Sequence, residues 1–281
     1  MDKGSAMNAP AVLDRLEEQA DRHTTPCGDG KMVWREWGAG PTLVLLHGGY
    51  GSWRHWVRNI DHFKQFRRVL VPDIPGLGDS DDAPDPTPDG IGQVIAQGLA
   101  QLVKPVERLD IVGFSFGSLV GAYAASHYRS PLTSLTLVGA GALGLPRTNI
   151  ILHRTDHEME ESERAALHKL NLGMLMIADP EHVDELAVTI QHINVGMARV
   201  KSRRFANTEN ITDALRQSRP DHLHVIWGEQ DAVAAGQFGV REAVLRAVRP
   251  DLTFKLIPAA GHWVSYEDAP AFNAYLTEIL R

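Results

Sequence analysis

Short runs of hydrophobic residues recur along the chain, and each run ends at glycine, proline or aspartate. Most are rich in valine, leucine and isoleucine, as is typical of strands buried on both faces of a parallel sheet. The runs that we predict as strands are Thr42–Leu46, Arg68–Val71, Leu109–Val112, Leu132–Val138, Leu223–Trp227 and Leu252–Ile257. Lys31–Trp37 alternates more regularly between hydrophobic and polar residues, which predicts an antiparallel hairpin with the segment before it.

Segments with helical spacing of hydrophobic positions lie between these strands. Phe116–Tyr128 is small and apolar on nearly every side, which predicts a buried helix. The other helices that we predict here are Ser52–Lys64, Ile91–Val103, Arg241–Val248 and Pro270–Leu280. Because strands that alternate with helices indicate βαβ units, we predict an α/β fold with a mostly parallel sheet flanked by helices.

This alternation stops between residues 145 and 219, where no strand-like run occurs. Charged helical patterns replace it, at Glu158–Leu172, Glu181–Val200 and Thr212–Gln217. Because roughly 70 residues are too many for one crossover, we predict a helical cap inserted over the carboxyl edge of the sheet, where ligands of such sheets bind. The predicted domains are a core of residues 21–144 and 220–281, a cap of residues 145–219 and an N-terminal extension of residues 1–20.

The N-terminal residues and the cysteine content narrow the class of protein. We interpret Met1–Ala6, which precede a second methionine, as added residues outside the fold. The first 20 residues lack the basic start and apolar stretch of a secretory signal, and no apolar run approaches the ~18 residues of a membrane helix. The single cysteine, Cys27, excludes a disulfide within the chain and argues against a cysteine-based metal site. We therefore expect a cytoplasmic protein with no membrane partner, either a monomer or a homodimer.

The charge balance and the absence of certain motifs exclude further classes of protein. The chain has 28 Lys and Arg against 35 Asp and Glu, a net charge of −7, so we expect no nucleic-acid partner. It has no dinucleotide fingerprint and no Walker loop, so we expect no cofactor and no metal. Four arginines of the predicted cap are interpreted as surface residues, with binding of a substrate carboxylate as the alternative: Arg154, Arg199, Arg203 and Arg204.

The sharpest chemical signal is Gly113-Phe114-Ser115-Phe116-Gly117, a G-x-S-x-G motif. It lies directly between a predicted strand and a predicted helix, which is the context that a nucleophile elbow requires. Glycines on both sides of the turn allow strand and helix to approach closely. We therefore expect Ser115 to project above the sheet at a helix N-terminus, where the helix dipole favours a developing negative charge.

A serine nucleophile needs a base, and the base needs an acid that orients it. His262 and Asp231 each follow a predicted strand, and the chain order Ser115, Asp231, His262 is that of an α/β-hydrolase triad. Glu229 is a rival acid two residues earlier. We prefer Asp231 because it falls later in its loop and therefore has more reach toward His262.

An oxyanion site completes this set of residues. His47-Gly48-Gly49-Tyr50-Gly51 follows the predicted strand Thr42–Leu46, and its glycines leave backbone N–H groups open to a substrate oxygen. We assign the two donors as the amides of Gly49 and Phe116, the residue after the nucleophile. His47 precedes the serine and ends a buried strand, so we interpret it as structural.

From about Lys31 onward, the chain resembles the α/β-hydrolase superfamily in these motifs. Asp73–Ser80 (DIPGLGDS) looks like the D-x-P-G-x-G-x-S turn of that family and is expected to be structural. The resemblance implies the α/β-hydrolase fold with an inserted cap and a serine hydrolase that needs no cofactor. Haloalkane dehalogenases and epoxide hydrolases of this fold carry Asp at the elbow, whereas Ser115 implies an acyl-enzyme.

Part of the sequence is similar to one branch of that superfamily, the meta-cleavage-product hydrolases, which cut a carbon–carbon bond in vinylogous diketones. The similarity lies in Gly261-His262-Trp263, with Glu267 and Phe272-Asn273 downstream. That branch usually has Asn before the nucleophile and H-G-x-G-P-G at the oxyanion loop. Here Phe114 and His47–Ser52 (HGGYGS) occupy those positions.

These departures set the order of our functional hypotheses. A small or medium carboxylic ester or a lactone comes first, and carbon–carbon bond hydrolysis comes second. A small-molecule receptor with little turnover, and an acyl transferase or perhydrolase that uses the same triad, stay open as alternatives. Tyr50, Phe114 and Trp263 are expected to shape the substrate pocket.

Overall fold

The computed structural model describes residues 8–281, apart from 146–149, 157, 208–210 and 235. Met1–Ala6, interpreted as added residues, lie outside the described residues. Eight strands form one sheet in the order β1-β2-β4-β3-β5-β6-β7-β8 within this part of the chain. Their bounds are β1 Asp21–Cys27, β2 Gly30–Trp37, β3 Thr42–Leu46, β4 Arg68–Pro72, β5 Leu109–Phe114, β6 Leu132–Val138, β7 Pro220–Gly228 and β8 Thr253–Ile257.

The pairing of the strands confirms the predicted α/β fold. Strand β2 pairs antiparallel with β1 and with β4, and all the remaining pairs are parallel. The predicted hairpin that opens the sheet is therefore present as β1 and β2. Because the parallel strands all end at one edge, the loops after β3, β5, β7 and β8 meet there.

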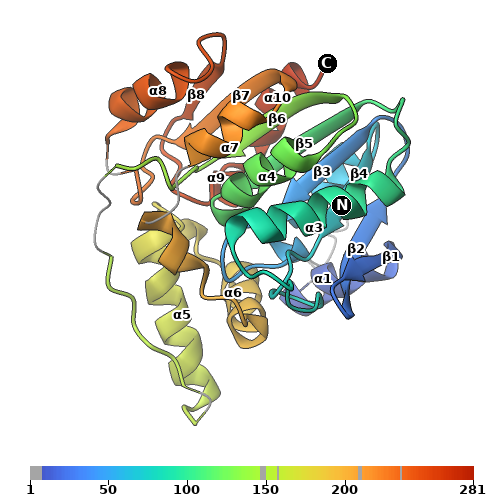
Figure 1. Cartoon of the computed structure of the whole chain (residues 1–281). Coiled ribbons are helices and arrows are strands. Elements are labelled where there is room, and N and C mark those ends of the chain that lie inside the picture. Colours follow the sequence, from blue (N-terminus) through green and yellow to red (C-terminus); the bar gives the residue numbers. More distant parts are fainter. Residues whose placement is uncertain (1–7, 146–149, 157, 208–210, 235) are drawn as a thin grey trace, which may run out of the picture.

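Helices cover both faces of the sheet (Figure 1). The α-helices are α1 Ala9–Glu18, α2 Ile60–Phe63, α3 Pro88–Leu102, α4 Phe116–His127, α5 Glu161–Leu175, α6 Glu185–Met197, α7 Ile211–Gln217, α8 Phe238–Arg246, α9 Val264–Glu267 and α10 Ala269–Ile279. The short 3₁₀ helices of the described residues are η1 Trp53–Trp56, η2 Pro180–His182 and η3 Ser202–Asn207.

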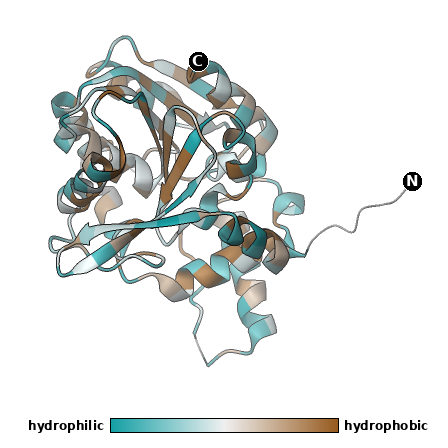
Figure 2. Cartoon of the chain, turned by 90° about the vertical axis from the view of Figure 1, so that its right-hand side faces the viewer, coloured by the Kyte–Doolittle hydropathy of each residue, from teal (hydrophilic) through white to brown (hydrophobic). Residues whose placement is uncertain are grey.

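Strand β3 shows why the sheet needs helices on both faces. Its side chains alternate between two hydrophobic clusters: Val44 and Leu46 pack with α3 and α4, whereas Leu43 and Leu45 pack with α2 and α10. All four side chains are fully buried. Apolar side chains on the strands therefore lie inside the molecule on both sides of the sheet. Figure 2, coloured by the hydropathy of each residue, shows hydrophobic segments on strands in the middle of the molecule.

The predicted helix Ser52–Lys64 is wrong, because two short helices, η1 and α2, take its place. The chain changes direction at Asn59, which is fully buried. The Asn59 side-chain amide donates hydrogen bonds to the Ser265 carbonyl at 2.9 Å and to Asn273 Oδ1 at 2.7 Å. These contacts with a distant part of the chain favour the break over a continuous helix.

The N-terminal extension contains the ordered helix α1, which the sequence analysis did not predict. Asn8 caps it by accepting a hydrogen bond from the Ala11 N–H. Leu13 and Leu16 are buried against the core, and the Leu16 carbonyl accepts a hydrogen bond from the Trp37 indole. Residues 9–18 therefore belong to the packed molecule rather than to a loose extension.

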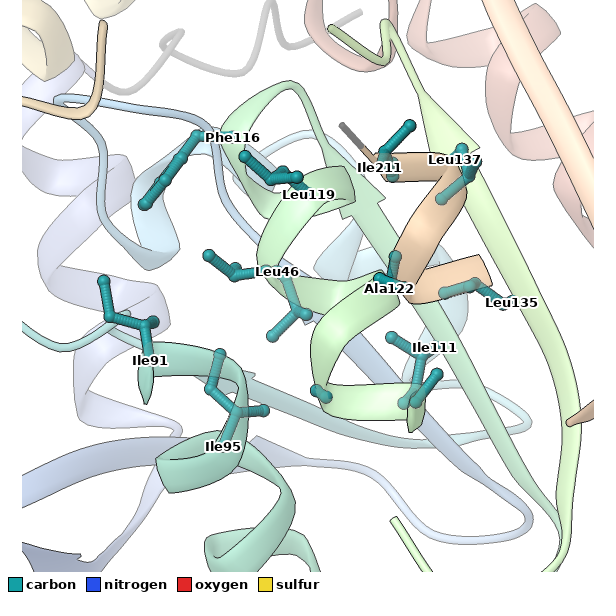
Figure 3. Close-up of a cluster of buried hydrophobic side chains, with 14 of the residues drawn as sticks. Leu46, Ile91, Ile95, Ile111, Phe116, Leu119, Ala122, Leu135, Leu137 and Ile211 are labelled. Carbon is teal, nitrogen blue, oxygen red and sulfur yellow. The ribbon is translucent and has the colours of Figure 1, made fainter. Parts of the chain in front are cut away.

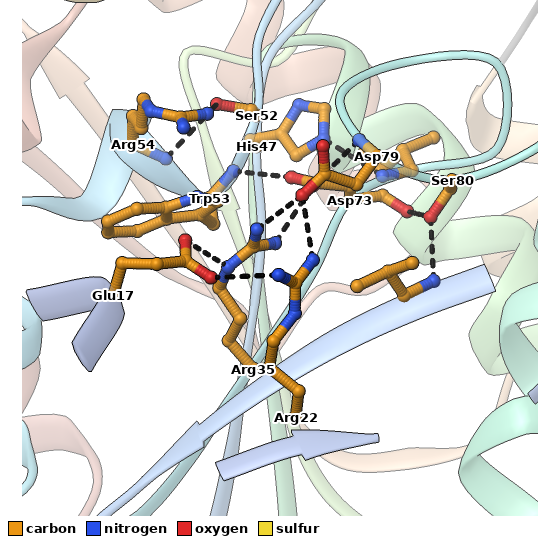
Figure 4. A network of polar contacts seen from close by, with 12 residues as sticks. Glu17, Arg22, Arg35, His47, Ser52, Trp53, Arg54, Asp73, Asp79 and Ser80 are labelled. Carbon is orange, nitrogen blue, oxygen red and sulfur yellow. Dashed lines mark hydrogen bonds and ion pairs between the residues drawn. The ribbon is translucent and has the colours of Figure 1, made fainter. Parts of the chain in front are cut away.

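Figure 4 shows the polar network that fixes this helix and the Asp73–Ser80 turn to the sheet. The fully buried Arg35 guanidinium contacts Glu17 at 2.7 Å, Asp73 at 3.0 Å and Asp79 at 2.5 Å. Ser80 Oγ donates to the Asp73 carbonyl and accepts from the Val33 N–H. Charges removed from water need such partners, so the network supports a structural role for the turn.

Helices α5 and α6 pack against each other beside the carboxyl edge of the sheet, where Figure 1 shows α5 extending away from the core. Helix α7 differs, because Ile211 packs with Leu119 and Ala122 of α4 in the hydrophobic cluster of Figure 3. We therefore propose a correction to the predicted cap of residues 145–219: α5, α6 and their connections form the cap, and α7 belongs to the core.

Candidate active site

Ser115 occupies the sharp turn between β5 and α4. Its φ is +52°, a left-handed conformation that residues other than glycine rarely adopt. The Ser115 N–H donates to the Val138 carbonyl on β6 at 2.7 Å, which holds the turn against the sheet. A Cβ at Gly113 would overlap the Gly117 carbonyl, and one at Gly117 would overlap the Leu46 carbonyl. Both glycines are therefore required by the close approach of strand and helix.

The structure brings Ser115, His262 and Asp231 into one chain of hydrogen bonds. His262 Nε2 lies 3.0 Å from Ser115 Oγ, and Nδ1 lies 2.8 Å from Asp231 Oδ2. This geometry assigns the Nδ1–H to the bond with Asp231 and leaves Nε2 free to accept from the serine hydroxyl. Both His262 and Asp231 are buried, so bulk water does not screen their interaction.

The Asp231 carboxylate has partners on both oxygens. Oδ1 accepts from the Val233 N–H at 2.8 Å and from the Ala234 N–H at 3.1 Å. Burial by itself would raise the pKa of Asp231. The charge and hydrogen bond of His262, together with the two amides, outweigh burial and lower that pKa. Asp231 therefore stays ionised beside the imidazole.

Glu229, the rival acid, lies in the same loop but is exposed. Its backbone N–H donates a hydrogen bond to the carbonyl of Ile257, the last residue of β8. The loop after β6 carries only small residues near the histidine, and a Cβ at Gly139 would lie 3.1 Å from the His262 ring. Among the described residues, Asp231 is thus the acid within hydrogen-bond distance of His262.

The loop after β3, from which we predict one oxyanion donor, lies close to the elbow, since a Cβ at Gly49 would lie 3.6 Å from the Phe116 Cβ. Gly49 and Phe116 both line the cavity above Ser115. A Cβ at Gly49 would overlap the Ser202 hydroxyl of η3, so this close approach explains the glycine. Tyr50, which we predict to shape the substrate pocket, has a φ of +52° and lines the same cavity.

Two buried histidines brace this loop. His47 Nε2 accepts from the Ile74 N–H, in agreement with the predicted structural role. His55, which the sequence analysis missed, accepts from the Gly48 N–H through Nδ1 at 3.2 Å. Burial, together with the charges of His47 and His262, holds the pKa of His55 well below its usual value. No local pattern marked His55, since it acts through a contact made by folding.

A cavity of about 520 Å³ lies between the triad residues and the cap. Phe114 lines it, and its ring packs 5.1 Å from the His262 ring. Trp263, predicted as a pocket residue, is outside the lining and fully buried. Its indole N–H donates to the His55 carbonyl and its ring stacks on Tyr266 at 4.2 Å. Trp263 therefore supports the wall from behind, and that prediction is wrong.

The predicted cap arginines divide into two pairs. Arg199 forms an ion pair with Asp82 at 2.9 Å, and Arg204 stacks over Phe205, so these two have structural contacts. Arg154 and Arg203 line the cavity. Neither has an acidic partner within the described residues, and no Asp or Glu of that part of the chain lines the cavity. The alternative role in carboxylate binding therefore stays open for this second pair.

Glu267 connects the histidine loop to the cap. Its fully buried carboxylate accepts from the Gly261 N–H at 2.6 Å, the Ala178 N–H at 2.9 Å and the Asp179 N–H at 2.8 Å. Gly261 directly precedes His262, and residues 178–179 connect α5 to α6. One side chain thus holds both the loop that carries His262 and the α5–α6 connection.

The chain belongs to the alpha/beta hydrolase family, which its sequence matches over residues 43–274. The 2-hydroxy-6-oxononadienedioate/2-hydroxy-6-oxononatrienedioate hydrolase of Comamonas testosteroni is 25% identical over 268 residues, covering 86% of this chain and 88% of that protein. The epoxide hydrolase 3 of Xenopus tropicalis is 22% identical over 267 residues, covering 86% and 71%. The family and these relatives support a hydrolase activity.

Solved structures agree on the fold. An esterase from Rhodococcus sp. ECU1013 superposes with a TM-score of 0.70 at 20% identity, covering 92% of this chain and 98% of its own. A meta-cleavage product hydrolase from Pseudomonas fluorescens IP01 gives 0.70 at 19% identity, covering 92% and 97%.

The described residues include neither a candidate membrane-spanning helix nor a candidate metal-binding cluster. None of their helices combines the length and apolar character needed to cross a bilayer. They contain no group of three or more His, Cys, Asp or Glu side chains placed to hold a metal ion.

Proposed function

We propose that this protein is a cofactor-free serine hydrolase of a small or medium carboxylic ester or lactone. The observation that carries the proposal is the hydrogen-bonded chain from Ser115 through His262 to Asp231 at the floor of a cavity. A hydroxyl becomes a nucleophile when a neutral imidazole can take its proton, and this geometry supplies that base.

In the proposed reaction, His262 Nε2 accepts the hydroxyl proton as Ser115 Oγ attacks the carbonyl carbon. The resulting imidazolium is stabilised by Asp231, and it then donates its proton to the leaving alkoxide. An acyl group remains on Ser115. Water attacks this acyl-enzyme, gives one proton to His262, and that proton returns to Ser115 Oγ as the acid leaves.

The carbonyl oxygen carries a negative charge in both tetrahedral intermediates. We propose that the backbone amides of Gly49 and Phe116 hold it. Neither amide has a partner among the hydrogen bonds of the described residues. Fixed donors of this kind contribute about 3–4 kcal/mol each to the transition state, because they need no reorganisation during the reaction.

The first test is steady-state hydrolysis of p-nitrophenyl butyrate by the wild type, Ser115→Ala and Ser126→Ala. Ser126 lies at the far end of α4, where its hydroxyl donates to the Tyr123 carbonyl, so it is a matched control. We expect Ser115→Ala to lose at least 10³-fold in kcat and Ser126→Ala to keep the wild-type rate. Retained turnover in Ser115→Ala would remove this serine from the mechanism.

Carbon–carbon bond hydrolysis is the second candidate. Several relatives are named as hydrolases of 2-hydroxy-6-oxo dienoates, compounds that carry carboxylates. Arg154 and Arg203 line the cavity without an acidic partner in the described part of the chain, and they would suit such a group. If a vinylogous diketone acid is turned over with a higher kcat/KM than any ester, carbon–carbon bond hydrolysis is favoured over ester hydrolysis.

A further inference from the structure

The cap contributes a buried histidine to the cavity that the proposed mechanism does not use. His168 lies on α5, lines the cavity and is only 2% exposed. Its Nδ1 is shielded from solvent and has no hydrogen-bond partner within the described part of the chain. Because a buried polar atom without a partner is costly, a cavity-lining side chain that carries such an atom is a candidate contact for a bound molecule.

The His168 side chain is uncharged at neutral pH. Burial, with smaller contributions from the charges of His192 and Arg164, lowers its pKa to about 4. A neutral imidazole has one N–H donor and one nitrogen acceptor. The ring meets the His192 ring of α6 edge to face at 5.5 Å, so it is held between the two cap helices.

The polar side chains that line the cavity near His168 differ in whether they have hydrogen-bond partners. Asn171, which also lines the cavity, already has partners on both side-chain atoms: its Oδ1 accepts from the His153 N–H and its Nδ2 donates to the His153 carbonyl. Gln191 of α6 lines the cavity with no hydrogen bond inside the described residues. The other cavity-lining residues of α5, its C-cap and α6 are apolar: Leu172, Leu175, Met176 and Val195.

We propose that His168, with Gln191 beside it, forms a second subsite that binds a neutral oxygen-bearing group of the substrate, a keto or hydroxyl oxygen. The inference rests on the proposed hydrolase function, because the subsite faces the same cavity as Ser115. A purely hydrocarbon chain leaves the buried nitrogen unpaired. A cationic group would find a neutral donor and acceptor there but no carboxylate from the described residues.

The test measures binding without turnover, in Ser115→Ala protein, by ligand-observed NMR. The probes are ethyl hexanoate, its 3-, 4- and 5-oxo derivatives and ethyl 3-hydroxyhexanoate. A keto or hydroxyl group that finds no partner in the cavity weakens binding, because it loses its hydrogen bonds to water. We expect at least one oxygenated ester to bind about tenfold more tightly than ethyl hexanoate. Comparing the affinities of the keto esters with that of the hydroxy ester shows which of the two groups the subsite prefers.

Variants made in the Ser115→Ala protein test whether His168 causes any preference for an oxygenated ester. His168→Leu should abolish it while leaving the affinity for ethyl hexanoate within about twofold. His168→Gln, which restores a hydrogen-bonding group, should recover part of it. His192→Leu is the matched control, since this ring touches His168 but does not line the cavity, and it should keep the preference.

Two results would overturn the subsite: no oxygenated ester binds more tightly than ethyl hexanoate, or His168→Leu keeps the preference. Neither result bears on ester hydrolysis by the wild type, so the two proposals can fail separately.

Discussion

At the scale of single residues, Asp231 and Glu229 stand two positions apart but occupy different environments. Asp231 is buried, its Oδ2 lies 2.8 Å from His262 Nδ1, and its Oδ1 accepts hydrogen bonds from two backbone N–H groups. Glu229 is exposed. The sequence contains both carboxylates, and only folding decides which one meets the imidazole.

Asp231→Asn should therefore lower kcat about 10⁴-fold, because an amide can turn its NH₂ group toward the imidazole and stabilise the wrong tautomer. Glu229→Gln should stay within about twofold of the wild type. Steady-state kinetics with p-nitrophenyl butyrate compare the two. Equal losses in both variants would contradict the assignment of the acid.

His224 on β7 allows a prediction about pH. Burial, with the charge of His222, lowers its pKa to about 4. Between about pH 6.5 and pH 4 the unfolded chain binds a proton that the folded protein does not, so the free energy of unfolding falls as the pH falls. A shift from 6.5 to about 4 corresponds to roughly 3 kcal/mol.

Urea unfolding of the wild type and His224→Asn at pH 7 and pH 4.5 measures this effect. The variant should lose less stability than the wild type on acidification. An identical pH dependence of the two proteins would show that His224 does not contribute to it.

At the scale of elements, the nucleophile elbow depends on close backbone contact. A Cβ at Gly117 would lie 2.6 Å from the His47 carbonyl oxygen and even closer to that of Leu46. Neither backbone atom can move without disturbing β3. By contrast, Gly173 on α5 has open space around its Cα and is exposed.

Gly117→Ala should therefore reduce the free energy of unfolding by about 3 kcal/mol or more. Gly173→Ala should raise it by about 0.5–1 kcal/mol, because alanine restricts the unfolded chain and favours the helix. Urea unfolding monitored by circular dichroism measures both changes. A Gly117→Ala protein as stable as the wild type would contradict the packing described for the elbow.

The elements that the sequence predicted well are those whose pattern is local. The strand Leu132–Val138 and the helix after Ser115 match the structure closely, because most positions of each are buried. The predicted helix Ser52–Lys64 failed because Asn59 makes its contacts with Ser265 and Asn273, more than 200 residues away. A one-dimensional pattern carries no information about such partners.

At the scale of the whole molecule, the α5–α6 connection and the loop before His262 share the Glu267 carboxylate. Its three backbone donors come from the histidine loop and from the α5–α6 connection. The His262 loop and the α5–α6 connection are thus held in one arrangement by a group that touches neither Ser115 nor the cavity.

Glu267→Gln should reduce the free energy of unfolding by about 2 kcal/mol. The NH₂ group of the glutamine would face a backbone N–H, whereas the carboxylate oxygen at that place accepts a hydrogen bond from it. The substitution should also lower kcat more than it changes KM, since Gly261 positions His262. Glu185→Gln, at an exposed position in the first turn of α6, is the control and should change little. Unchanged kcat in a destabilised Glu267→Gln would limit this residue to a structural role.

The sequence by itself determined the α/β class, the order of Ser115, Asp231 and His262, and the loops that carry them, because buried strands and tight turns leave local signatures. Only the tertiary structure decided that Trp263 lies behind the cavity wall, that His55 and Glu267 brace the loops, and that His168 faces the cavity. These outcomes depend on contacts between distant segments, whose geometry is fixed when the sheet, the helices and the cap pack together.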